Sequence, residues 1–88
     1  MDQTDIVIHS VSALKLPVIE IETNQSKKYK CDLSSFKEVV CFPKNQKEWK
    51  DISITAQGFN IIWGCRFEIH VLQAIDCRIS ETDLKLHA

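Results

Sequence analysis

The stretch DISITAQGFNIIWGCRFEIH, residues 51–70, decides the fold because it holds two alternating segments joined at one glycine. Apolar side chains occupy every second position before Gly58, and the alternation resumes after it with Phe59, Ile61 and Trp63. A period of two is typical of a half-buried antiparallel strand. The stretch therefore predicts a β-hairpin that turns at Gly58 and ends at Trp63.

A second hairpin is predicted upstream, over residues 18–33, with a polar turn at residues 24–26. Isoleucines alternate with glutamates in its first half, and Tyr29 and other apolar residues alternate with charged residues in its second half. The outward residues carry opposite charges on the two strands, and such cross-strand pairs stabilise a sheet. We therefore expect the glutamates of the first strand to face the lysines of the second.

Three further segments complete the expected fold. Ser35 and Glu38 have the spacing of a capping box, which predicts a helix of about two turns that ends near Phe42. Pro43 is expected to open a second short helix that runs to Lys50. Residues 68–75 fit either a third helix or another strand.

The sequence thus predicts one α+β domain over residues 1–76. It would contain a small antiparallel sheet of about five strands, including one over residues 6–11, with two or three short helices on one face. Beyond Gly64 the alternation weakens. We expect residues 77–88 to form a loosely ordered C-terminal tail.

Composition argues against several classes of protein. The 88 residues carry a net charge of −1 and contain two glycines, so no Gly-rich phosphate loop is expected. The four cysteines and three histidines lack the close spacing of a metal site. No signal peptide and no membrane span is predicted, and the expected location is the cytoplasm, with reduced thiols.

Enzymatic activity is not expected, and neither is a cofactor or a bound metal. Cys65, Arg66 and His70 are the best candidates for thiol chemistry, since a neighbouring cation lowers a thiol pKa and a histidine can act as a base. Cys65 fits equally well as an ordinary turn residue, and no nucleophile elbow surrounds it. The sequence leaves open whether the Cys65 thiol is reactive.

A basic run over residues 27–30 supports an alternative, regulatory nucleic-acid binding. Lys28 and Lys30 would contact phosphates, and Tyr29 would stack on a base. The competing interpretation is a solvated strand face whose tyrosine points into the core. The near-neutral chain favours the second interpretation, because a protein that binds nucleic acid usually has a strongly basic surface.

Protein binding is the favoured class of function. Ile62 interrupts the polar face of its strand, and Arg66 follows shortly after, so both are expected to contact a partner. Trp63 and Phe67 belong to the same predicted patch, although Trp63 is first expected to fill the core. Exposed strand edges also allow a homodimer.

The order of these elements resembles a small bacterial family called domain of unknown function 2442. The residues that match are Asp32-Leu33, Trp49 at a position where the family has Phe, Gly58, and Ile62-Trp63. The resemblance covers roughly residues 6–75. The turn at residues 24–26 departs from the family in lacking glycine, and Phe67-Glu68-Ile69 replaces its Asp-Leu step.

The resemblance implies an α+β fold and no established active site. It also implies a stand-alone family member of the kind often encoded beside another small protein, in an arrangement similar to toxin–antitoxin pairs. We therefore expect a non-enzymatic protein-interaction module, antitoxin-like or an accessory component of a two-protein pair. The identity of its partner and its oligomeric state are not predicted.

Overall fold

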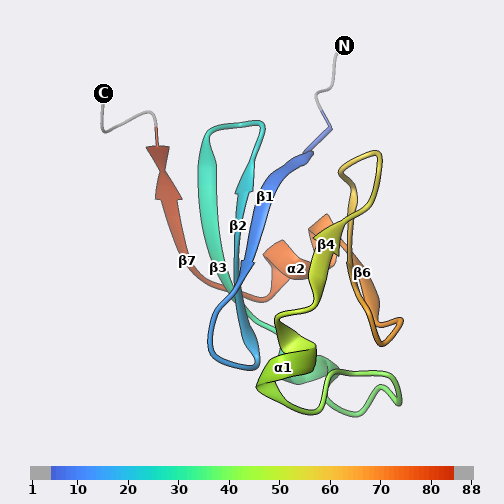
Figure 1. The fold of residues 1–88 in the computed structure, drawn as a ribbon. Coiled ribbons are helices and arrows are strands. Elements are labelled where there is room, and N and C mark those ends of the chain that lie inside the picture. Colours follow the sequence, from blue (N-terminus) through green and yellow to red (C-terminus); the bar gives the residue numbers. More distant parts are fainter. Residues whose placement is uncertain (1–4, 85–88) are drawn as a thin grey trace.

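The computed structural model describes residues 5–84, which form two antiparallel sheets joined by short helices (Figure 1). The larger sheet has the order β1-β2-β3-β7, and its strands are β1 (Ile8–Ala13), β2 (Val18–Thr23), β3 (Lys27–Asp32) and β7 (Arg78–Asp83). The smaller sheet has the order β4-β5-β6, and its strands are β4 (Ile52–Ile54), β5 (Asn60–Trp63) and β6 (Glu68–His70). The helical segments are a 3₁₀ turn (Ser34–Phe36), α1 (Gln46–Trp49) and α2 (Val71–Asp76).

The expected fold class is wrong. The described chain is mostly β, with seven strands in two sheets and two short α-helices, rather than one sheet of five strands covered by helices. The helices are four and six residues long, which is too short to cover the apolar face of a sheet. The two sheets instead supply buried side chains to a common core.

The β2–β3 hairpin agrees with the sequence prediction. Glu20 lies opposite Lys30, and Glu22 lies opposite Lys28. The inward residues Ile19 and Ile21 have no exposed surface. A period of two fixes the register of a strand whose one face is buried, because a slip by one residue would exchange the two faces.

The segment after β3 departs from the predicted helix. Only Ser34–Phe36 form a 3₁₀ turn, and no side chain caps it. The carboxylate of Asp32 accepts a hydrogen bond from the Ser34 amide at 2.9 Å. An Asx-type contact of this kind favours a turn over a helix.

The second predicted helix is shorter than expected and begins later. The first residue of α1 is Gln46, not Pro43; Asn45 is the N-cap, and its side chain accepts a hydrogen bond from the Glu48 amide at 2.8 Å. The Glu48 carboxylate in turn accepts from the Lys44 amide. An asparagine cap with a glutamate three residues later is a strong helix start, so the cap sets the boundary.

The C-terminal part of the domain was the least well predicted. Residues 68–75 contain both of the expected alternatives, since β6 ends at His70 and α2 begins at Val71. The expected tail begins instead with β7, which pairs antiparallel with β3; residues 85–88 of that tail lie outside the described part. Within residues 5–84, no helix is long and apolar enough to span a bilayer.

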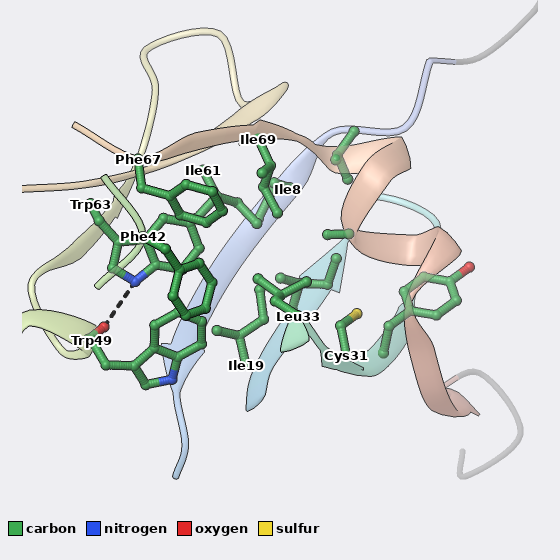
Figure 2. Close-up of a cluster of buried hydrophobic side chains, with 14 residues drawn as sticks. Ile8, Ile19, Cys31, Leu33, Phe42, Trp49, Ile61, Trp63, Phe67 and Ile69 are labelled. Carbon is green, nitrogen blue, oxygen red and sulfur yellow. Dashed lines mark hydrogen bonds between the residues drawn. The ribbon is translucent and has the colours of Figure 1, made fainter. Parts of the chain in front are cut away.

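The core centres on two stacked tryptophans (Figure 2). The rings of Trp49 and Trp63 lie 5.0 Å apart, and both side chains are at most 1% exposed. The indole N–H of Trp63 donates to the carbonyl of Trp49, and the indole N–H of Trp49 donates to the carbonyl of Val18. These hydrogen bonds attach α1 to both sheets and satisfy both buried indoles.

Candidate functional site

The four residues of the predicted interface patch do not form one surface, because two are buried and two are accessible. Trp63 and Phe67 are only 1% and 2% exposed and therefore cannot form a contact surface. Their rings lie 5.0 Å apart in the core, which confirms the structural role expected for Trp63 and shows that Phe67 has the same role. Of the four predicted contact residues, Ile62 and Arg66 remain accessible.

Ile62 and Arg66 lie on the smaller sheet and its turn. Ile62 is half-buried, opposite Ser53 and Glu68 on the outer face of β5. Arg66 is exposed and has a φ of 76°, a left-handed conformation that the β5–β6 turn requires. The backbone of Arg66 thus forms the turn, and its exposed side chain leaves the predicted contact role untested.

The lysine run lies on the larger sheet, beside acidic side chains. Lys28 and Lys30 face glutamates across the hairpin, and Lys27 makes an ion pair of 2.8 Å with Glu81 of β7. This contact raises the pKa of Lys27 and lowers the pKa of Glu81. Tyr29 is buried, so no ring in this run is available to stack on a base.

The cysteines are separate free thiols, and all four lie within the described residues. Burial raises the pKa of the Cys31 thiol to about 12, which keeps it protonated and poorly nucleophilic. The Cys65 thiol donates to the carbonyl of Cys41 at 3.0 Å, while Nδ1 of His70 accepts from the Leu72 amide. Within residues 5–84, no three His, Cys, Asp or Glu side chains are placed to hold a metal ion.

Among residues 5–84, the most exposed large apolar side chain belongs to Val40, in the loop between the 3₁₀ turn and α1. Val40 is 89% exposed and Val39 is 42% exposed. They border a hollow of about 520 Å³, which we call the valine groove; it is lined by Leu16 and by side chains of residues 37–44 other than Cys41. Sequence reasoning missed this groove because both valines fall within the helix predicted to end near Phe42.

The loop that carries the valine groove is anchored to the core on both sides. Phe36 packs edge-on against Phe67 with ring centroids 5.8 Å apart, and Phe42 packs against Phe67 and Trp49. Val39 donates to the carbonyl of Phe36, and Phe42 donates to the carbonyl of Val39. The exposed valines are therefore held between two fixed aromatic side chains.

The lining of the valine groove carries two lysines and one glutamate, and the Glu48 carboxylate lies beside the Lys44 amide. Lys37 and Lys44 stand at the two ends of the loop and are exposed, and Glu38 is the acidic side chain among the lining residues. Lys15, also exposed, precedes the lining residue Leu16. An aliphatic surface with cationic ends is complementary to an apolar segment with acidic flanks.

No family model, no curated protein and no solved structure matches this chain. The resemblance to domain of unknown function 2442 therefore stays a prediction, based on residues such as Trp49, Gly58 and Ile62-Trp63. Two of these residues have clear structural roles. Trp49 is a central core residue, and Gly58 has a φ of 80° in the β4–β5 turn.

Proposed function

We propose that this chain is a non-enzymatic protein-interaction module that binds its partner through the valine groove. The observation that carries the proposal is the exposure of Val40, 89%, next to Val39 on an anchored loop. Full burial of a valine side chain contributes about 1.5–3 kcal/mol. Two adjacent valines above a preformed hollow therefore provide a compact anchor point.

The partner segment that fits this groove is aliphatic and has acidic flanks. The valines and Leu16 would contact its apolar residues, while Lys37 and Lys44 would face its carboxylates. Charges at the rim mainly accelerate encounter and select among partners, whereas the buried apolar contacts supply most of the affinity. Binding should therefore persist, with slower association, at raised ionic strength.

The biological setting that we propose comes from the family resemblance. A member of domain of unknown function 2442 that stands alone would act as the antitoxin-like or accessory half of a two-protein pair. The cytoplasm is the compartment we propose, since all four thiols are free and the cytoplasm keeps thiols reduced.

The test is capture of the partner by the full chain, with variants that separate the groove from other apolar sites. Tagged wild type, Val40→Asp and Ile79→Asp would be incubated with host lysate and compared by quantitative mass spectrometry. Ile79 is a matched control because it is also exposed, 59%, but lies on β7. We expect wild type and Ile79→Asp each to capture one stoichiometric protein. The amount of this protein captured by Val40→Asp should be at least tenfold lower.

The capture experiment requires that Val40→Asp and Ile79→Asp both fold. Both substitutions are at exposed positions, where effects on stability are usually within about 0.5 kcal/mol. Equal recovery of the partner by Val40→Asp and wild type would reject the valine groove as the binding site. Recovery of nuclease-sensitive material alone would reject the proposed function itself.

A further inference from the structure

A second hollow of about 250 Å³ lies on a different part of the molecule, where the N-terminal segment meets β6 and α2. Its lining residues include Asp5, Phe59 and His70, with aliphatic side chains between them. The rings of Phe59 and His70 are nearly parallel, with an interplanar angle of 6° and centroids 6.5 Å apart. We call this hollow the ring pocket.

The His70 wall of the ring pocket is held by hydrogen bonds. The Leu72 amide donates to Nδ1 of His70 at 3.1 Å, and the His70 amide donates to the side chain of Gln73 at 2.8 Å. These two hydrogen bonds give the His70 ring a fixed orientation.

Backbone hydrogen bonds also hold the segments that carry Phe59 and Asp5. The carbonyl of Phe59 accepts from the Val71 amide at 2.8 Å, and the neighbouring Gly58 carbonyl accepts from Ile8. The side-chain amide of Asn24 donates to the carbonyl of Asp5 at 3.1 Å. The backbone around the pocket thus needs little reorganisation when a ligand binds.

The chemistry of the ring pocket selects a planar cation. The Asp5 carboxylate is exposed and makes no ion pair among residues 5–84. Two aromatic faces and one carboxylate are the groups that recognise a guanidinium, which stacks on rings and donates a fork of N–H groups to a carboxylate. The volume suits one side chain rather than a drug-sized molecule.

We propose that the ring pocket binds a guanidinium group, with Asp5 as its counter-ion and Phe59 and His70 as its stacking surface. The proposal goes beyond the function proposed above, because it concerns a separate site and does not depend on the valine groove. Two sources share this chemistry: the side chain of an arginine in a polypeptide, and free arginine.

The experiment is an NMR titration of the full chain with three probes. These are Nα-acetyl-arginine amide, free arginine, and Nα-acetyl-citrulline amide, which has a similar shape but no charge. We expect shift changes at Phe59, His70 and Leu72 with the first probe, and binding at least tenfold weaker with the citrulline probe. If free arginine binds as well as Nα-acetyl-arginine amide, the bound guanidinium would be assigned to a free guanidino compound. If free arginine binds markedly more weakly, it would be assigned to an arginine in a polypeptide.

Two variants complete the test. Asp5→Asn should weaken binding of the arginine probe by about tenfold. Asp76→Asn, which alters an exposed carboxylate in α2, should leave this binding unchanged. Val40→Asp should also leave it unchanged, so that this inference and the valine groove can fail separately. Equal binding of the citrulline probe, or no effect of Asp5→Asn, would overturn the guanidinium assignment, as would an absence of shifts at Phe59 and His70.

Discussion

The indole N–H of Trp63 donates to the backbone carbonyl of Trp49 at 3.0 Å, while the two rings stack with centroids 5.0 Å apart. One pair of residues thus connects β5 of the smaller sheet to α1. The hydrogen bond from Trp49 to Val18 extends the connection to the larger sheet. This arrangement supports the loop that carries the valine groove, because Phe42 packs on Trp49.

Trp63→Phe should destabilise the fold. The substitution retains a ring but leaves the Trp49 carbonyl without its donor, which costs about 1–3 kcal/mol for a buried polar group. Urea denaturation monitored by circular dichroism would measure the change in the free energy of unfolding. Ile79→Ala, at an exposed site, is the control and should change it by less than about 0.5 kcal/mol. An equally small change for Trp63→Phe would show that the indole hydrogen bond is not important for stability.

Gly58→Ala should destabilise the β4–β5 turn. Gly58 has a φ of 80°, and an added Cβ would meet the Val7 side chain. The left-handed conformation alone costs a non-glycine residue about 1–2 kcal/mol. Thermal unfolding of Gly58→Ala would be compared with that of Gln57→Ala, an exposed neighbour. If both variants melted at the same temperature, the strain assigned to position 58 would be absent.

The Cys31 thiol should make the fold sensitive to alkaline pH. Its folded-state pKa is raised from 9.0 to about 12, so folding favours the protonated thiol. The corresponding stability is complete below pH 9 and declines as the pH rises toward 12, by about 1.4 kcal/mol per pH unit. Chemical denaturation at several pH values would show a steeper decline for wild type than for Cys31→Ala. Parallel pH profiles would contradict the assignment.

Glu81→Gln should loosen β7. Glu81 pairs with Lys27, and its lowered pKa means that this stabilisation is present above the unfolded-state pKa and is lost as the pH falls through the folded-state value. Amide hydrogen exchange should become faster in β7 and stay unchanged in β5. The control is Asp76→Asn, which removes an exposed carboxylate outside the strand. Unchanged exchange in β7 of Glu81→Gln would show that backbone pairing alone holds the strand.

The parts of the fold that follow hydrophobic alternation could be predicted from sequence. The β2–β3 hairpin, its register of Glu20 opposite Lys30, and the turn at Gly58 all follow from a period of two or from a special backbone conformation. Trp63 was expected in the core because large aromatics dominate small cores. These features depend on local pattern, which the sequence carries directly.

The errors occurred where a local side-chain hydrogen bond or a pairing between distant strands overrides the pattern of apolar residues. The spacing of Ser35 and Glu38 predicted a helix, but the Asp32 side chain took the Ser34 amide and the chain turned instead. β7 has no inward apolar stripe, since most of its residues are exposed, and it is held by backbone pairing with β3. Because these errors hid the loop of Val39 and Val40, the valine groove could be found only in the structure.

Binding at the valine groove is tested most directly by site-specific photo-crosslinking in the native host. A photoreactive benzoylphenylalanine would replace Val40, Ile62, Arg66 or Ile79 in turn, and adducts would be identified by mass spectrometry. We expect one major protein adduct from position 40 and little or none from positions 62, 66 and 79. The same adduct from positions 62 and 66, without one from position 40, would contradict binding at the valine groove and place the interface on the smaller sheet.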